Sequence, residues 1–507
     1  MRRARGFFRA MTRVAMLGLT VLVAVLVYNT LRFPSRQIDV EPVAMSELPE
    51  QQILDRFAES LTIKTISYPT PARIDSEAFD RFKQFLEASF PLVHENLSRM
   101  TGTDFGDERN QSLLFKWQGL EESAAKPILL MGHYDVVPIE TASIDNWTNG
   151  PFSGKVDEQY VWGRGAIDNK AAAVGMMEAI ERLIAAGFQP SRTIYVSLGH
   201  DEEIGGTRGN RPIAEWMKSQ RIQLEYVLDE GGGIFNDFAG LDGPAAFIGI
   251  GEKGFVTLEL TAKVEEAGHS SMPPPLPQTA IGILGEALDR LHHSPHRADI
   301  DRGMGMTLEY LGSEMSWMQR VAIANRWLFD PLLIRQLDNT PLGNAALRTT
   351  IAPTIVEGGV KDNVLPTQAT MTLNLRILPG DSIESAIKHI EDVLKDLSID
   401  IVATAMQRPP SKRLSSTDCD AFEQLHRSIR QIYPSVVVAP FVVVAGTDAS
   451  HYEELDLAKE TYRFVPWRLG KEDLKRIHGI DERLARDDYL DLVRFYEQLI
   501  RNSCEPV

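Results

Sequence analysis

The pattern of apolar and polar residues divides the chain into distinct parts. In residues 48–252, short apolar runs alternate with stretches whose apolar positions recur at helical spacing. This pattern predicts helices at residues 48–68, 76–90 and 171–186, and strands at residues 112–117, 128–132, 193–198 and 224–228. Because alternating strands and helices build parallel sheets covered on both faces, this part is typical of a doubly wound α/β domain.

From about residue 254 the pattern changes, because apolar and polar residues alternate as in a half-exposed strand. The elements then follow the β-α-β-β-α-β order of a split-βαβ sandwich, with strands at residues 255–263, 349–356, 367–377 and 399–405 and helices at 280–291 and 382–397. An additional helical stretch lies near residues 299–347. The α/β pattern returns with a helix at 418–432, a strand at 436–444 and a helix at 486–501. We therefore expect an α+β domain, residues 253–406, inserted between two parts of the first domain, residues 48–252 and 407–507.

The amino terminus carries five arginines followed by an apolar run at residues 14–27. Extended to Leu31, this run approaches the ~20 residues that cross a bilayer as a helix. Arginines before the run place the amino terminus in the cytoplasm and the rest of the chain outside it, in the periplasm or the extracellular space. We expect residues 1–36 to form a cytoplasmic stub and transmembrane anchor, and residues 37–47 a linker. A cleaved signal peptide is the alternative.

Composition narrows the classes of function. The 507 residues carry a formal net charge of −17, which argues against nucleic acid as a partner. There are two cysteines, Cys419 and Cys504, so any metal must be held by His, Asp and Glu side chains.

The first candidate chemistry lies in the segment ILLMGHYD, where a predicted buried strand ends in His133 and Asp135. Side chains two apart on a strand point the same way, so these two can meet. A carboxylate that fixes one ring nitrogen of a histidine is the partner that a metal-bound imidazole needs. In open α/β sheets, ligands gather at the carboxyl ends of strands.

Further acidic and histidine side chains follow other predicted strands or begin a helix: Asp168 in WGRGAIDNK, Asp201, Glu202 and Glu203 in GHDEEIGG, Asp229 and Glu230 in LDEGGG, and His451 in GTDASHY. Each has a structural alternative, because Asp168 suits a helix N-cap, Asp229 a turn cap and His451 a buried core position. Adjacent carboxylates such as Glu202 and Glu203 repel each other unless a cation or a proton offsets the repulsion. Together, this mixture of oxygen and imidazole donors indicates a pair of zinc ions.

These motifs, with EKGF…GHSSMPP, GGVKDNVLP and IHGIDER, occur in one order over residues 48–501. In this the sequence resembles the M20 family of zinc metallopeptidases, and most closely its carboxypeptidase S and N-acyl-amino-acid amidase branch. The resemblance implies that residues 48–252 and 407–507 form a zinc-peptidase catalytic domain, with residues 253–406 as a lid and dimerisation domain. It also implies two zinc ions per subunit and a cis peptide at Asp168-Asn169.

The resemblance also implies a role for each matching residue. His133 and Asp229 would hold one zinc ion, Glu203 and His451 the other, and Asp168 would bridge them; Glu202 would be the general base and Asp135 the partner of His133. Glu230 competes with Asp229 as the ligand, and Asp229 is preferred for its place in the family's motif.

In the inserted domain, the resemblance implies that His269 supports the oxyanion of the tetrahedral intermediate and that Asn363 and Arg376 contact the substrate. Taken alone, His269 and the serines and prolines that follow it suit a plain turn. An Arg fits a substrate carboxylate because its planar fork binds it through two hydrogen bonds. The loop at Gly446 contacts substrate in relatives and departs here from the usual paired glycines. In many relatives the histidine enters the neighbouring subunit's site, which favours a homodimer, with a monomer as the alternative.

The sequence thus predicts an amide hydrolase for peptides or N-acyl amino acids that bear a free carboxylate. N-fatty-acyl-amino-acid hydrolysis or synthesis is the alternative within the family. A catalytically dead, membrane-tethered binding protein is disfavoured, because every expected ligand and Glu202 are present.

Overall fold

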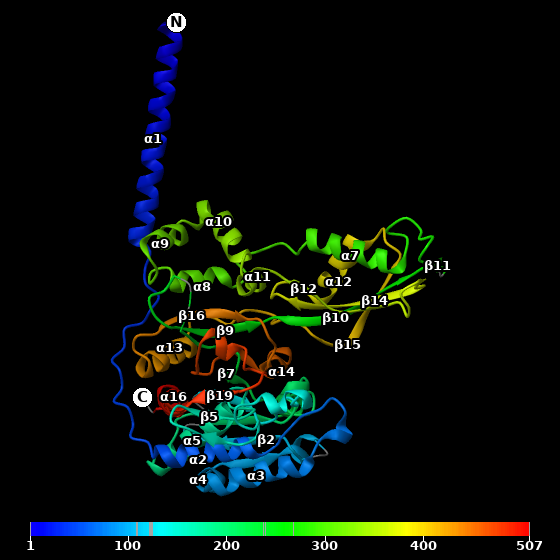
Figure 1. Ribbon diagram of the computed structural model, residues 1–507. Helices are drawn as coiled ribbons and strands as arrows, with labels where there is room; N and C mark the ends of the chain where they lie inside the picture. The colour runs from blue at the N-terminus through cyan, green and yellow to red at the C-terminus, as the bar shows by residue number, and fades with distance from the viewer. Residues whose placement is uncertain are drawn as a thin grey trace.

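The computed structural model describes residues 2–107, 110–120, 125–236, 238, 240–266 and 268–505. It consists of a mixed α/β domain, a smaller domain with an antiparallel sheet, and one long helix, α1 (Arg2–Arg32), that projects from the body (Figure 1). The smaller domain is hereafter the lid.

The α/β domain is built on a ten-stranded sheet in the order β1-β2-β6-β3-β7-β17-β9-β8-β18, with β16 paired to β9. Its strands are β1 (Ser98–Thr101), β2 (Leu113–Trp117), β3 (Ile128–His133), β6 (Ile194–Gly199), β7 (Leu224–Asp229), β8 (Gly233–Phe235), β9 (Ala245–Glu252), β16 (Val437–Val443), β17 (Ala458–Arg463) and β18 (Arg468–Leu469). The strands β6, β3, β7 and β17 run parallel, whereas β1 and β2 pair antiparallel with their neighbours and β9 pairs antiparallel with β17 and β8. The sheet is therefore mixed, and the expected parallel region is its centre.

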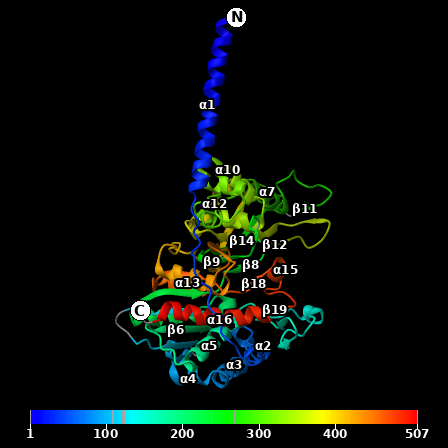
Figure 2. The same ribbon diagram turned by 90° about the vertical axis from the view of Figure 1, so that its left-hand side faces the viewer.

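Helices cover both faces of this sheet. One face packs against α2 (Glu50–Thr62), α3 (Ser76–Ser89), α4 (Pro91–Asn96), α5 (Lys170–Ala185), α13 (Asp420–Ile432) and α16 (Arg486–Cys504). The other face packs against α6 (Asn210–Ser219) and α14 (Ala449–Glu454). The short helix α15 (Lys471–Leu474) and a small sheet of β4 (Lys155–Val156), β5 (Tyr160–Trp162) and β19 (Arg483–Ala485) complete the domain. Figure 2 shows α16 running across the body.

The lid sheet has the order β12-β14-β10-β15, which is the order of a split-βαβ sandwich. Its strands are β10 (Gly254–Lys263), β12 (Thr350–Gly358), β14 (Gln368–Ile377) and β15 (Ile399–Arg408), and its helices are α7 (Ala280–His293) and α12 (Ile383–Leu394). Every second side chain of β14 is buried against these helices, as the alternating pattern predicts. A two-stranded ribbon, β11 (Gly268–His269) with β13 (Val364–Leu365), lies at the far end of the lid (Figure 1).

The additional helical stretch is also present, as α8 (Met304–Leu311), α9 (Trp317–Ala324), α10 (Arg326–Asp338) and α11 (Pro341–Leu347). Figure 1 shows α9 and α10 beside the carboxyl end of α1, and Figure 2 shows α10 there as well. Within α1, Met11–Arg32 is long and apolar enough to cross a membrane, and no other helix in the described ranges is.

One predicted element is too long. The helix expected at residues 48–68 ends at Thr62, and Ile66 pairs instead with Val136 in an extended bridge. The segment from Thr62 to Ile66 is rich in β-branched residues, whose side chains lose χ1 freedom in a helix and favour extended backbone.

Candidate metal centre

The site lies where three adjacent strands of the sheet end. Because β6, β3 and β7 are parallel neighbours, their carboxyl ends share one edge. His133 ends β3, the turn at residues 202–204 follows β6, and Glu230 follows β7. Side chains from separate strands therefore meet at this edge, and their role as metal ligands stays a prediction.

His133 is the centre of the cluster and is 1 % exposed. Its Nδ1 lies 3.2 Å from Asp135 Oδ1, while its Nε2 lies 3.0 Å from Asp168 Oδ1 and 3.1 Å from Glu230 Oε1. The two oxygens of Asp135 also accept the backbone N–H groups of Glu202 and Glu203, at 3.2 and 3.3 Å. Asp135 therefore orients both the imidazole and the turn that carries the two glutamates.

Asp168 is placed by the buried carboxylate of Glu482, from the IHGIDER motif. Glu482 accepts the backbone N–H groups of Gly165, Ile167 and Asp168 at 3.0, 2.8 and 3.1 Å and pairs with Arg164. The Asp168-Asn169 peptide is cis, as predicted. Burial opposes the ionised form of Asp168, but hydrogen bonds with His133 and His478 lower its pKa below the ordinary value.

His478 joins the cluster, although it was not among the predicted ligands. Its Nε2 lies 3.1 Å from Asp168 Oδ2 and 3.0 Å from Glu203 Oε2, and these carboxylates raise its pKa to about 10. The backbone of His478 is left-handed, with φ of 59°, and its carbonyl accepts a hydrogen bond from Arg164. The signal was in the sequence, because IHGIDER supplies both His478 and Glu482.

Two expected ligands lie elsewhere. His451 Nε2 is 3.2 Å from the Gly205 carbonyl and 3.8 Å from Asp448 Oδ1, and burial lowers its pKa to about 4. Asp229 Oδ2 accepts the backbone N–H of Ala449 at 2.8 Å. Of these two neighbouring carboxylates, it is Glu230 whose oxygen lies within 3.1 Å of His133 Nε2. In the described structure the side chains that contact His133 and Asp168 are thus those of Glu230 and His478, whereas His451 and Asp229 make the contacts given above.

The side chains present fit a divalent metal. His133, Asp168 and Glu203 bring one ligand atom each within 4.8 Å of one another, and so do His133, Glu202 and Glu230. Burial raises the pKa of Glu203 and of Glu230 to about 7 each, and raises that of Glu202 well above its ordinary value. Glu203 Oε1 is buried without a hydrogen-bond partner in the described structure. Several carboxylates crowded around one imidazole are what a bound cation stabilises.

The expected substrate residues of the lid do not contact this cluster within one chain. His269 is exposed in β11, with Nδ1 2.9 Å from Ser271 Oγ, and the Asn363 carbonyl accepts the Ser270 N–H at 3.2 Å. Figure 1 shows β11 at the end of the lid away from the large sheet. Arg376 lies in β14, over the ring of Phe255. A Cβ at Gly446 would be 2.9 Å from Nη1 of Arg408, whose Nη2 donates to the Gly205 carbonyl at 3.3 Å.

Comparisons with known proteins identify the family of the chain. The model of Peptidase family M20/M25/M40 matches residues 129–502. The chain is 39% identical to the probable carboxypeptidase S-like 2 of Dictyostelium discoideum, over 95% of this chain and 92% of that protein. It is 35% identical to the N-fatty-acyl-amino acid synthase/hydrolase of Xenopus tropicalis, over 96% of this chain and 94% of that protein.

The fold is also similar to solved structures. An M20 family metallo-carboxypeptidase from Sulfolobus solfataricus superposes with a TM-score of 0.63 at 17% identity, covering 89% of this chain and 99% of that one. A dinuclear metal binding peptidase of the M20 family from Bacillus subtilis gives a TM-score of 0.52 at 14% identity, covering 90% and 99%. By its matched family model and its near full-length relatives, the chain belongs to peptidase family M20, in the carboxypeptidase S-like branch of metallopeptidases and amidohydrolases.

Proposed function

We propose that this protein is a two-zinc hydrolase that cleaves the amide bond of peptides or N-acyl amino acids bearing a free carboxylate. The observation that carries the proposal is the cluster of His133, Asp168, Glu203, Glu230 and His478 around the carboxyl ends of three parallel strands. Two imidazoles and three carboxylates form a donor set that suits zinc.

Asp168 lies between the two halves of this set, with Oδ1 towards His133 and Oδ2 towards His478. We assign His133 and Glu230 to one ion, Glu203 and His478 to the other, and Asp168 to both. When bound, the ions supply Lewis acidity, lowering the pKa of a water towards ~7 and polarising the scissile carbonyl.

Glu202 is the general base of the proposed reaction. It is held in place through its backbone N–H, which donates to Asp135, and burial raises its pKa well above the ordinary value. A carboxylate whose pKa is raised can take a proton from the attacking water and then deliver it to the leaving amine.

The substrate class follows from the relatives' names, which include carboxypeptidase S-like proteins and N-fatty-acyl-amino acid synthase/hydrolases. Both classes of substrate present an amide next to a free carboxylate. Arg376 remains our proposed carboxylate ligand, because no carboxylate of the described residues pairs with it and it lies on the lid. Gly446 remains a proposed substrate contact.

We further propose that α1 is retained as a membrane anchor. The side chain of Asn325 on the lid insertion is fully buried against α1, where its Nδ2 donates to the Leu26 carbonyl at 3.1 Å and lies 3.4 Å from Thr30 Oγ1. Asn29 Nδ2 donates to Asn325 Oδ1 at 2.9 Å. Cleavage after the apolar run would remove these partners, which favours an anchor over a signal peptide.

Within one chain His269 has no contact with the metal centre. A homodimer through the lid would instead bring His269 to the metal centre of the neighbouring subunit. The edge strand β12 supports the proposal, because it leaves Ile355 and Val356 53% and 66% exposed.

The test is turnover by the zinc-loaded full chain, with an N-acyl amino acid and a dipeptide as substrates and Glu202→Gln as the inactive control. Hydrolysis of either substrate by wild type, and of neither by Glu202→Gln, supports the proposal. If the wild-type chain binds zinc and hydrolyses neither, the alternative of a membrane-tethered binding protein takes its place.

A further inference from the structure

The helical insertion of the lid exposes an apolar surface beside α1. On α9 the side chains of Trp317 and Met318 are 50% and 76% exposed, and on α10 those of Trp327, Leu328 and Leu332 are 62%, 40% and 57% exposed. We call these five residues the α9–α10 surface. Single exposed apolar residues are ordinary, whereas five on two consecutive helices, two of them tryptophans, are typical of an interaction site.

The helix α10 buries none of its residues fully, although it contains Trp327, Leu328, Phe329, Leu332, Leu333, Ile334 and Leu337. Leu333, Ile334 and Leu337 pack against the core of the insertion, whereas Trp327, Leu328 and Leu332 lie uncovered. Leu328 and Leu332 lie one turn apart, so they project from the same side of the helix. The surface therefore lacks its partner within one chain.

The position of α1 identifies the partner. The end of α1 is fixed to α9 and its flanks by the buried Asn325, by Arg320 Nη2, which donates to the Phe33 carbonyl at 2.8 Å, and by Ser35 Oγ, which donates to Glu314 at 2.7 Å. The 22 residues of Met11–Arg32 span about 33 Å as a helix, close to the thickness of a bilayer core. Figure 1 shows helices α9 and α10 beside this end of α1, which is where a membrane-spanning α1 would leave the bilayer.

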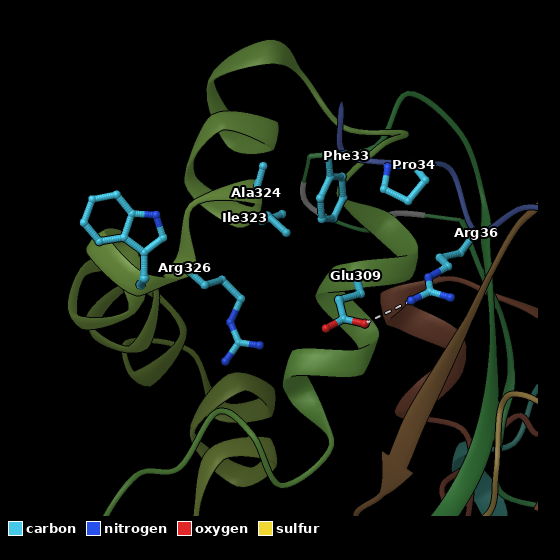
Figure 3. A pocket seen from close by; sticks show the side chains of 8 residues that line it. Phe33, Pro34, Arg36, Glu309, Ile323, Ala324 and Arg326 are labelled. Carbon is cyan, nitrogen blue, oxygen red and sulfur yellow. Dashed lines mark ion pairs between the residues drawn. The ribbon is translucent and has the colours of Figure 1, made fainter. Parts of the chain in front are cut away.

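A pocket of about 360 Å³ lies between the foot of α1 and the start of α10 (Figure 3). Apolar side chains of Phe33, Ile323 and Trp327 line it together with Arg326 and the pair of Arg36 and Glu309, whose charged atoms are 3.8 Å apart. Charged groups of both signs beside apolar walls suit a phospholipid head group and its first acyl carbons. Tryptophan and arginine are also the residues that settle at membrane interfaces.

We propose that α9 and α10 form a second membrane contact, lying in the outer head-group layer of a phospholipid bilayer beside the anchor. This inference rests on the proposed retention of α1. An interfacial helix lies with its apolar side about 5–10 Å into the boundary between head groups and acyl chains. Two contacts, one spanning and one interfacial, would fix how the lid and the catalytic domain face the membrane.

The test uses the full chain in phosphatidylcholine vesicles with some phosphatidylglycerol, collected by flotation. An environment-sensitive fluorophore is attached at Leu328→Cys, at Val23→Cys within α1, or at Leu120→Cys, which follows β2 far from α1, each in a Cys419→Ser background. Lipids with a nitroxide near the glycerol end or near the methyl end of the acyl chain then report the depth of each label. Leu120 is the matched control, because it is also an exposed leucine, at 64%.

We expect the label at position 328 to be quenched by the shallow nitroxide more than by the deep one, and the label at position 120 by neither. Adding Trp317→Asp should reduce the quenching at position 328 while hydrolytic activity in detergent is unchanged. Quenching at position 23 without quenching at 328 overturns the interfacial contact and leaves the anchor in place. Quenching at 328 without quenching at 23 overturns the anchor alone. If the fluorophore at position 328 reports the same buried environment in lipid-free detergent as in vesicles, the surface is assigned to a second copy of the chain. That result also overturns the proposal.

Discussion

Substitution of Glu482 by alanine should disturb the metal centre from a distance, although Glu482 is not one of the proposed ligands. Its carboxylate accepts three backbone N–H groups in the segment that carries Asp168, and it pairs with Arg164. Arg164 in turn donates to the carbonyls of His478 and Gly479 at 3.0 Å each. One side chain thus fixes the backbone of two proposed ligands.

The size of the expected loss in stability and in metal affinity follows from the burial of Glu482. Glu482 is fully buried and the Arg164 side chain is 3% exposed, so Glu482→Ala leaves a buried charge without its partner. Removing one member of a buried ion pair costs about 3–5 kcal/mol of folding free energy. Loss of a residue that orients metal ligands lowers metal affinity by about 10–100-fold. Glu482→Gln keeps one acceptor for the backbone N–H groups, so it should lose less folding free energy and less metal affinity than Glu482→Ala.

The assay is urea denaturation with a chelator present, for stability, and competition with a fluorescent zinc chelator, for affinity. The matched control is Glu472→Gln, an exposed residue nearby that pairs with Lys475; it should change stability by no more than about 0.5 kcal/mol. If Glu482→Ala retains both the zinc affinity and the unfolding free energy of wild type, the reasoning about this carboxylate is refuted.

Other predictions concern single residues. Glu202→Gln should keep its zinc while kcat falls by ~10² or more, whereas Glu203→Gln should lose zinc and recover partly when zinc is added; elemental analysis and kcat at several zinc concentrations distinguish the two. His269→Ala should raise the kinetic barrier by ~2.7–4 kcal/mol if the residue is an oxyanion donor, and activity within about twofold of wild type rejects that role. Burial lowers the pKa of His426 to about 3, so the unfolded chain binds a proton between this value and 6.5 that the native chain does not. The free energy of unfolding should therefore decrease as the pH is lowered from 6.5 to about 3, by at most about 1.4 kcal/mol per pH unit. In urea titrations at several pH values, His426→Leu should remove this contribution to the pH dependence of stability.

Much of the fold could be predicted because its signals are local. Apolar runs marked β3, β6 and β7, and helical spacing marked α3, whose Phe79, Phe82 and Phe85 are buried. The strand β17 was not predicted, because its sequence AKETYR has no apolar run. It is nevertheless buried between β7 and β9, where Arg463 pairs with Glu252 and Glu453. Burial of paired charges depends on tertiary contacts that a single segment does not reveal.

The site was predictable where its residues follow strands and less so where they lie in loops. His133, Glu202 and Glu203 follow apolar strands, so the edge that they share was evident from the pattern. His478 lies in a loop, more than 200 residues from any other proposed ligand, and its place is set by Glu482 and Arg164. The choice between Asp229 and Glu230 depends on the side to which each points after β7. Because β7 is buried on both faces, its apolar pattern does not predict that side.

The central claim is a two-zinc site with His478 as a ligand and His451 outside it. It is tested most directly by the zinc content of His478→Ala and His451→Ala, purified with limiting zinc and measured by mass spectrometry. The account predicts that His478→Ala loses zinc relative to wild type and that His451→Ala retains the wild-type content. Loss of zinc from His451→Ala, with full zinc in His478→Ala, would contradict it.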